Sequence, residues 1–294
     1  MNILSLFDGI SCGQVALNQL GIKVNNYYAS EINPYSIKVT QANYPSTKQV
    51  GDITKLYRGA ISPHIDLLIG GSPCQGFSFM GKQLNLEDPR SKLFFEYVRI
   101  LKEIRQNNPN VLFLLENVRM KKESQDIISK NLGVEPILIN SALFSAQNRN
   151  RLYWTNIPID PIISNNTQVL GDILESNVDK KYYCSLKRAN GIIKSKFLDT
   201  KPNNRDKKCS CLLLSNNRKF SVNNFDLYKT YEERGYITQQ ELDTLDFRTL
   251  TPIEYERLQT LPDNYTNYVA DGHRYKECGN GWTVEVIKHL FKNL

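Results

Sequence analysis

The chain has 294 residues, of which 40% are hydrophobic and 23% are charged, with a formal net charge of +7. This balance is typical of a globular protein of one or two domains and excludes a mainly disordered chain. No apolar stretch approaches the roughly 18 residues that a membrane-spanning helix needs, and the first residues lack the basic start of a signal peptide. Six cysteines without a C-x-x-C pair favour a reducing, cytoplasmic setting over a disulfide scaffold.

The first 157 residues alternate short apolar runs with amphipathic stretches. Several of the runs are apolar without alternation, which is typical of strands buried on both faces. A helix is clearest at 91–106, where Leu93, Tyr97 and Leu101 recur at helical spacing. Alternating strands and helices predict an α/β fold with a mostly parallel sheet. The expected strands are Asn2–Phe7, Tyr27–Ser30, Ile65–Gly70, Val111–Leu115, Pro136–Asn140 and Leu152–Thr155.

The residue composition changes at the start of the second half of the chain. From about 157 to 247, Asn, Lys and Ser become more frequent and the apolar periodicity weakens, which indicates a second domain or a long insertion. Residues 180–219 hold twelve basic and two acidic side chains, a net charge of +10. Such a stretch, which includes Lys207 and Lys208, is either a solvated loop or a surface that neutralises phosphates.

Helical order returns near the end of the chain. Thr251 is expected to cap a helix, with Pro252 at its first position and Glu254 completing a capping box. Residues 283–292 form a short amphipathic pattern that predicts a helix packed back on the sheet.

Three turns near the start of the chain suggest a nucleoside ligand. Phe7-Asp8-Gly9 ends the first strand, and its glycine allows a tight turn and a close approach of the backbone to a ligand. The second strand ends in Glu31, which can accept hydrogen bonds from ribose hydroxyls, and Asp52 can accept from an adenine amino group. The G-x-G-x-x-G fingerprint of dinucleotide binding is missing. Ordinary turn residues of an α/β domain remain an alternative for these positions.

The segment from Gly70 to Ser78 is more specific. An apolar strand delivers Cys74 to its C-terminal end, behind Pro73 and between glycines, where α/β sheets place their ligands. A free cysteine is usually a small buried hydrophobe, but this flank favours a presented nucleophile. Another apolar strand ends in Glu116-Asn117, which brings a proton donor to the same edge. Arg149 and Arg151 alternate in Gln147-Asn148-Arg149-Asn150-Arg151 and therefore share one face of a strand.

In this order, the motifs resemble those of the DNA (cytosine-5)-methyltransferase family. The resemblance covers 1–157 and 248–294 and rests on FDGISCG, GDI, GGSPCQGFS, LLENV, QNRNR, RTLTPIEYERLQTLPD and GNGWTVEVI. FDGI, LFFEYVRIL and the Trp-containing end look closest to the animal de novo DNA methyltransferases. Ser11 and Gly281-Trp282 depart from the commonest bacterial pattern, and these departures concern the cofactor pocket.

The resemblance implies nucleophilic catalysis on a cytosine ring. The Cys74 thiolate would add to carbon 6, which places electron density on carbon 5 for methylation. Glu116 would donate a hydrogen bond or proton at nitrogen 3, Arg151 would hold the ring oxygen, and Arg149 would support the thiolate. Asn117 is expected to position its neighbours rather than to act as acid or base.

The resemblance also implies the cofactor S-adenosyl-L-methionine and a Rossmann-like methyltransferase fold with a smaller target-recognition domain. We expect residues 1–157 and 272–294 to form the catalytic and cofactor-binding domain and 158–271 to form the target-recognition domain. No metal site is expected, because Cys209 and Cys211 lack a second pair of ligands. The cofactor pocket is expected to use Phe7, Gly9, Glu31, Ile32, Asp52, Ile53, Pro73, Leu93, Asn280 and Trp282.

The expected substrate is cytosine in double-stranded DNA. Because carbons 5 and 6 are not accessible inside a duplex, the base must be flipped out, with residues 75–90 closing over it as a mobile loop. We expect a monomer in a prokaryotic or phage-infected cytoplasm, without a membrane partner and with the option of a cognate restriction endonuclease. Three alternatives stay open: a tRNA cytosine-5 methyltransferase, a catalytically inactive DNA-binding homologue, and an unrelated nucleotide-binding oxidoreductase.

Overall fold

The structure is a computed structural model of the chain. It describes residues 1–57, 59, 61–62, 64–73, 89–187, 189–190, 205–212, 224–244 and 247–294. The expected nucleophile Cys74 and residues 75–88 of the expected loop lie outside the described residues. The same holds for much of the basic stretch, of which 180–187, 189–190 and 205–212 are described.

The chain divides into two compact units. Unit 1 comprises 1–140, 150–163 and 281–294, and unit 2 comprises 141–149 and 164–280. Both termini therefore belong to unit 1. These boundaries differ from the expected ones, because residues 141–149 and 272–280 belong to unit 2 and residues 158–163 belong to unit 1. The backbone of Ala146 and Asn148 is hydrogen bonded to Cys209, which attaches the first of these segments to unit 2.

Unit 1 is built on a mostly parallel sheet, as the sequence predicts. Among the described residues the sheet has seven strands in the order β3-β2-β1-β4-β5-β7-β6. The pairs from β3 to β5 are parallel, whereas β7 runs antiparallel to both β5 and β6. The strands are β1 (Asn2–Leu6), β2 (Asn26–Ser30), β3 (Lys48–Gln49), β4 (Leu67–Gly71), β5 (Leu112–Val118), β6 (Ile137–Asn140) and β7 (Asn150–Thr155).

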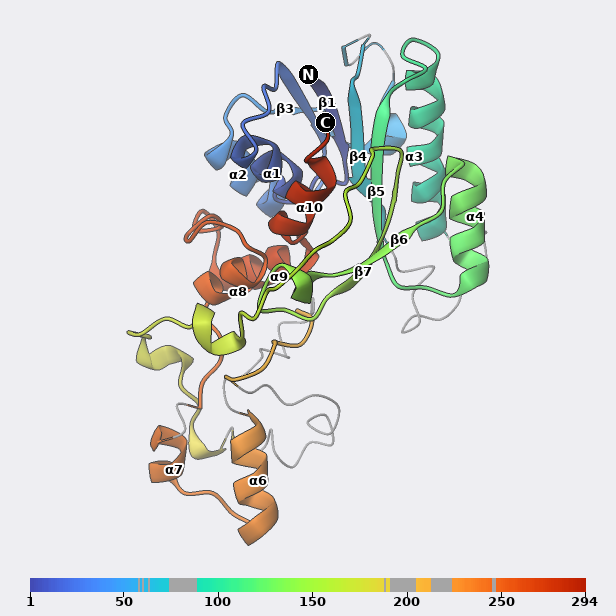
Figure 1. Cartoon of the computed structure of the whole chain (residues 1–294). Helices are drawn as coiled ribbons and strands as arrows, with labels where there is room; N and C mark the ends of the chain where they lie inside the picture. The colour runs from blue at the N-terminus through green and yellow to red at the C-terminus, as the bar shows by residue number, and fades with distance from the viewer. Residues whose placement is uncertain are drawn as a thin grey trace. The chain divides into compact units, whose positions relative to one another are not determined.

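Helices cover both faces of this sheet (Figure 1). On one face, α3 and α4 pack against Leu4, Leu68 and Phe113 in a continuous core. On the other face, α1 and α10 pack against each other. Because successive side chains of a strand point to opposite faces, every inner strand must be apolar throughout, which explains the unbroken apolar runs. The helices of unit 1 are α1 (Cys12–Gln19), α2 (Pro34–Asn43), α3 (Pro89–Arg105), α4 (Lys122–Leu132) and α10 (Val284–Phe291).

Unit 2 holds a smaller core and mostly short elements. Cys184, Ile237, Leu242 and Phe247 form part of one apolar cluster. Tyr255 of α8 stacks edge-on against Tyr275 of α9, with ring centroids 4.7 Å apart. The described helices of this unit are α6 (Asn224–Arg234), α7 (Gln239–Thr244), α8 (Pro252–Leu258) and α9 (Asp271–Asn280), with short 3-10 turns at Ser141–Leu143, Leu170–Ile173 and Lys180–Tyr182.

The capping box expected at α8 is confirmed. Thr251 accepts from the Glu254 backbone N–H at 3.2 Å, and Glu254 Oε2 accepts from the Thr251 N–H at 2.7 Å. Glu254 is fully buried, and both of its oxygens also accept from the Arg248 guanidinium, at 2.7 and 2.8 Å. The start of α8 is therefore fixed by a buried ion pair as well as by its cap.

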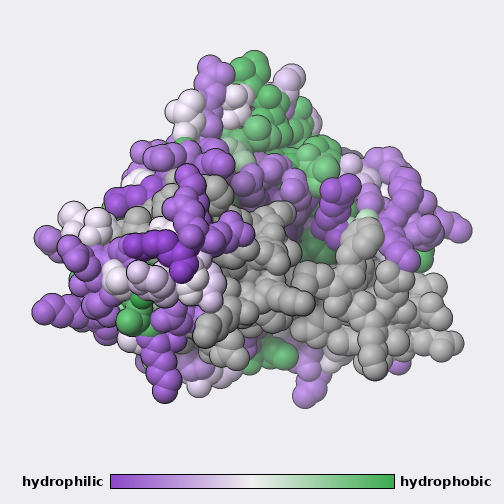
Figure 2. All heavy atoms as spheres, turned by 90° about the horizontal axis from the view of Figure 1, so that it is seen from below, coloured by the Kyte–Doolittle hydropathy of each residue, from purple (hydrophilic) through white to green (hydrophobic). Residues whose placement is uncertain are grey.

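The described surface has a mixed character. The face shown in Figure 2 is mostly hydrophilic among its described residues, with smaller hydrophobic areas. Within the parts of the chain that the structure describes, no helix is long and apolar enough to span a membrane.

Candidate active site

The loop after β1 is wound into left-handed turns. Phe7, Gly9 and Ser11 all have positive φ angles, of 57°, 59° and 57°. Such angles are uncommon for residues other than glycine and often mark functional sites. The Gly9 N–H points to the next strand, where it donates to Glu31 Oε2 at 2.8 Å. This contact ties the loop after β1 to the end of β2.

The expected acidic residues stand at adjacent strand ends of unit 1. The other oxygen of Glu31 accepts from the backbone of Ile32 and Asn33, each at 2.8 Å. Asp52 follows β3 and caps a short 3-10 turn, where its Oδ1 accepts from the Thr54 N–H at 2.9 Å. This hydrogen bond from the backbone stabilises the carboxylate and lowers the pKa of Asp52 below its usual value. The parallel order β3-β2-β1 therefore brings the three turns to one edge of the sheet.

The apolar members of the expected pocket differ in exposure. Ile32 is 74% exposed, which leaves its side chain available to a flat ligand, whereas Ile53 is buried in the core and would offer only its backbone. Phe7 and Leu93 are partly buried and pack against the core beneath the strand ends.

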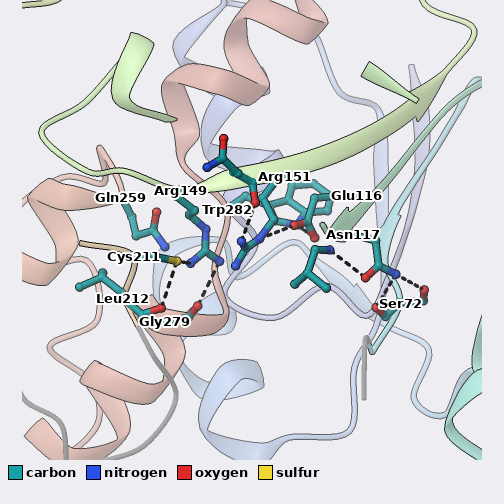
Figure 3. A network of polar contacts seen from close by, with 12 residues as sticks. Ser72, Glu116, Asn117, Arg149, Arg151, Cys211, Leu212, Gln259, Gly279 and Trp282 are labelled. Atoms are coloured by element: carbon teal, nitrogen blue, oxygen red, sulfur yellow. Dashed lines mark hydrogen bonds and ion pairs between the residues drawn. The ribbon is translucent and has the colours of Figure 1, made fainter. Parts of the chain in front are cut away.

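Trp282 connects the two halves of the site in unit 1. A Cβ placed on Gly13, in the first turn of α1, would lie 3.6 Å from the indole ring. At its other edge the indole N–H donates to Glu116 Oε2 at 3.1 Å. Trp282 therefore lies between the start of α1 and the carboxylate of Glu116, as Figure 3 shows for the latter contact.

Glu116 and Arg151 form a close ion pair. Arg151 Nε lies 2.9 Å from Glu116 Oε1. The side chain of Arg151 is only 15% exposed and that of Glu116 only 12%. In the antiparallel β5–β7 ladder, Glu116 stands opposite Tyr153 and Arg151 stands opposite Val118. Diagonal neighbours of this kind share one face of the sheet, which explains why a glutamate and an arginine from separate motifs meet.

Glycine makes room for this pair at the end of β4. Gly71 is paired with Glu116 in the ladder. A Cβ at Gly71 would lie 2.9 Å from Glu116 Oε2, a distance that real Cβ contacts essentially never show, and a tight 3.1 Å from Trp282 Nε1. Glycine at position 71 therefore lets Glu116 and Trp282 keep their observed places over the strand end.

Asn117 anchors the residues that precede Cys74. It is buried, and its amide donates to the carbonyl oxygen of Ser72 at 3.3 Å and to the Ser72 hydroxyl at 3.1 Å (Figure 3). Pro73 follows directly. The arrangement fixes the backbone at the point from which the chain continues to Cys74.

Arg149 and Asn280 belong to unit 2, whereas the site residues described above belong to unit 1. Arg149 is 3% exposed, and its guanidinium donates to the Gly279 carbonyl at 3.1 Å and to the Cys211 sulfur at 3.6 Å. Gln259, which the sequence did not single out, donates to the Cys278 carbonyl at 2.6 Å. Arg149 and Gln259 thus hold the last carbonyls of α9, directly before Asn280. The only sequence signal for Gln259 was its place in the LQTLPD motif.

The ammonium group of Lys208 in the basic stretch is held by backbone carbonyls of unit 2. Its ammonium donates to the carbonyl oxygens of Ser145 at 3.0 Å and Asn166 at 3.2 Å. Burial lowers the pKa of Lys208. Lys207 is exposed. Of the two neighbours, Lys207 is the more exposed.

No metal centre is found among the residues that the structure describes. No group of three or more His, Cys, Asp or Glu side chains is placed there to hold an ion. Cys209 is buried, and burial raises the pKa of its thiol far above the usual range. A thiol held neutral in this way is a poor metal ligand.

Comparisons with known proteins agree with these observations. The family model for the C-5 cytosine-specific DNA methylase matches residues 1–294. Type II methyltransferase M1.ScrFI of Lactococcus lactis subsp. cremoris is 33% identical over 99% of this chain and 77% of its own length. Type II methyltransferase M.SsoII of Shigella sonnei is 30% identical over 99% of this chain and 79% of its own length.

Solved structures share the fold. A DNMT2 mutant of Spodoptera frugiperda matches with a TM-score of 0.77 and 22% identity, over 99% of this chain and 98% of that one. The expected Rossmann-like methyltransferase fold is thereby confirmed.

Proposed function

The chain belongs to the C-5 cytosine-specific DNA methylase family and is a DNA cytosine-5 methyltransferase, and we propose that it methylates a flipped-out cytosine in double-stranded DNA through a covalent adduct with Cys74. The observation that carries the proposal is the Glu116–Arg151 ion pair, which lies at the edge of the sheet where the parallel strands β4 and β5 end. In the sequence, Pro73 and Cys74 follow directly after β4. The pair supplies an acid and a cation where a cytosine ring needs both.

The residues of the first three strand ends fit S-adenosyl-L-methionine. Glu31 and Asp52 offer carboxylate oxygens for hydroxyl and amino groups. A Cβ on Gly9 would meet no atom of the described residues within 4 Å, which leaves room for a ligand beside the loop. Phe7, Ile32 and Trp282 offer apolar or aromatic faces beside them, and an aromatic face attracts a cation. Pro73, Leu93, Ile53 and Asn280 complete the proposed set. The bound cofactor would supply an electrophilic methyl group on a positively charged sulfonium sulfur, which leaves as the neutral thioether of S-adenosylhomocysteine.

The side chains of the site divide the remaining work. The Cys74 thiolate attacks carbon 6 of the cytosine, and the bond that forms pushes an electron pair toward carbon 5. Glu116, in its protonated form, donates at nitrogen 3, and Arg151 donates to the ring oxygen, so that both quench the developing charge. Asn117 holds the backbone before Cys74, and Arg149 holds the segment that leads to Asn280. After methyl transfer, loss of the carbon-5 proton expels the thiolate and restores the ring.

Unit 2 is proposed to recognise the DNA. Support comes from the net charge of +10 over residues 180–219, because lysine and arginine side chains neutralise phosphates. Residues 75–90 are proposed to close over the flipped base. The relatives named Type II methyltransferases support a cognate restriction endonuclease as partner, and their bacterial sources support a cytoplasmic location. A monomer is part of the same proposal.

The deciding experiment offers two nucleic acids to the purified protein. Transfer of a tritiated methyl group from S-adenosyl-L-methionine is measured on duplex DNA and on tRNA, with Cys74→Ser as the inactive control. We expect incorporation into DNA as 5-methylcytosine. Incorporation into tRNA alone would favour the alternative substrate, and no incorporation into either would favour an inactive homologue.

A further inference from the structure

The left-handed loop after β1 is held by a chain of side-chain hydroxyls around one carboxylate. Asp8 Oδ1 accepts from the Tyr27 hydroxyl at 2.9 Å, and Asp8 Oδ2 accepts from the Ser11 hydroxyl. The Thr40 hydroxyl of α2 lies 3.2 Å from the Ser11 hydroxyl and 3.3 Å from the Gly9 carbonyl. We call the residues Asp8, Ser11, Tyr27 and Thr40 the hydroxyl clasp.

The clasp spans the elements that surround the proposed cofactor pocket. Tyr27 lies on β2, Ser11 caps α1, and Thr40 lies on α2, so one carboxylate joins the loop to its neighbours. Ser11 is completely buried, and its φ of 57° lies in the region that favours glycine. The hydrogen bond to Asp8 compensates for this unfavourable backbone conformation.

We propose that Asp8 is a positioning residue for the cofactor, which holds the loop at 7–11 in its binding conformation by tying Ser11 to Tyr27. This inference rests on the proposed use of S-adenosyl-L-methionine. Asp8 does not contact the cofactor itself. By maintaining the turns of the loop, the clasp fixes the backbone of Phe7 and Gly9, the neighbours of Asp8 that are proposed to contact the cofactor. The hydrogen bond between Ser11 and Asp8 explains why the chain tolerates serine at position 11, where glycine would adopt the positive φ without strain.

The charge of Asp8 matters for the clasp. A carboxylate accepts a hydrogen bond from each of the two hydroxyls. When Asp8 is protonated, one of its oxygens carries a hydrogen and becomes a donor, so one of the two hydroxyls must accept instead of donate. The groups that interact with it are the hydroxyls of Ser5, Ser11 and Tyr27 and the carboxylate of Glu31. Burial, followed by the negative charge of Glu31, raises the pKa of Asp8 to about 6 against the effect of the hydroxyl hydrogen bonds. The clasp therefore weakens as the pH falls below about 6.

The first test measures binding of S-adenosylhomocysteine by calorimetry at pH 7.5. Asp8→Ala is expected to weaken binding about tenfold, because the loop loses its fixed conformation before the ligand arrives. Adding Ser11→Gly to Asp8→Ala is expected to restore at least part of the affinity, since glycine needs no compensation at a positive φ. A loss of affinity that did not arise from the strained turn at Ser11 would not be repaired by this second substitution.

The second test is the pH profile of the same binding between pH 5.0 and 7.5. The wild-type affinity is expected to fall by up to about tenfold at pH 5, where roughly a tenth of Asp8 is ionised. Asp8→Asn is expected to lack this dependence. Asp126→Asn serves as a matched control, because Asp126 pairs with Lys122 on the surface of α4, and it should keep the wild-type profile.

The outcomes separate the two proposals. If Asp8→Ala binds as tightly as wild type, if Ser11→Gly restores nothing, or if Asp8→Asn keeps the wild-type pH profile, the positioning role of Asp8 is wrong while the proposed function stands. If the wild-type protein does not bind S-adenosylhomocysteine, the cofactor assignment fails and the inference fails with it.

Discussion

The indole N–H of Trp282 donates to the carboxylate of Glu116 at 3.1 Å, although 166 residues separate the two in the chain. The other carboxylate oxygen of Glu116 meets Arg151 at 2.9 Å. Glu116 is therefore held from both sides, by the C-terminal segment and by β7. Trp282, expected only to cover the cofactor, also orients the proposed proton donor.

Replacing Trp282 with Phe should separate these two roles. The phenyl ring keeps an aromatic face beside the cofactor pocket but cannot donate to Glu116. We expect kcat for DNA methylation to fall about tenfold, with a smaller change in affinity for S-adenosylhomocysteine. Trp154→Phe is the control, because Trp154 donates to Ser129 in the core at 3.0 Å, outside the site. That variant should lose stability and keep its kcat, and equal losses of kcat in the two variants would contradict the role of Trp282.

Gly71→Ala tests the packing beneath Glu116. The new methyl group would lie 2.9 Å from Glu116 Oε2 and must displace the carboxylate or Trp282. We expect kcat to fall by about a hundredfold, as misplaced catalytic groups commonly cause. Gly59→Ala is the control, since among the described residues its methyl group would meet the ring of Tyr57, which is 68% exposed. Wild-type turnover by Gly71→Ala would show that Glu116 need not occupy its observed place.

The strands and the site residues were predictable to different degrees. Apolar runs and Gly-rich strand ends placed β1, β2 and β4 within one or two residues, because burial on both faces leaves a strong composition signal. The end of β5 was expected at Leu115 but lies three residues later, at Val118, because the polar Glu116 and Asn117 continue the strand. The two-residue strand β3 carries no such signal and was missed. The meeting of Glu116 with Arg151 depends on the antiparallel register of β5 and β7, which no single motif contains. The clasp role of Asp8 likewise depends on Tyr27 from another strand.

The buried ion pair of unit 2 predicts an unequal response to two similar substitutions. Glu254 is fully buried against Arg248, so Glu254→Gln leaves an uncompensated charge in the core. We expect a loss of about 3–5 kcal/mol in the free energy of unfolding, measured by urea denaturation. Asp263 pairs with Arg257 at 2.6 Å but is 44% exposed, so Asp263→Asn should cost less than about 1 kcal/mol. Equal losses in the two variants would mean that burial does not determine how much these ion pairs contribute to the free energy of unfolding.

The neighbours Lys207 and Lys208 should differ in their effect on DNA binding. Lys207→Ala is expected to lower the slope of log affinity against log salt by about one unit on target and random duplexes alike, since phosphates carry no sequence. Lys208→Ala should leave the slope unchanged and reduce thermal stability, because the Lys208 ammonium is bound to Ser145 and Asn166. Binding is measured at several salt concentrations. An unchanged slope for Lys207→Ala would identify its surroundings as an ordinary solvated loop.

The covalent role of Cys74 is tested most directly by a trapped adduct. A duplex with 5-fluorocytosine at the target position is incubated with the protein and S-adenosyl-L-methionine, because fluorine cannot leave as a cation and the final elimination stalls. We predict a denaturation-resistant complex that forms only with the cofactor, is absent in Cys74→Ser, and maps to Cys74 by peptide analysis. An adduct on Cys12, Cys209 or Cys211, or an active enzyme that forms no adduct, would contradict the proposed mechanism.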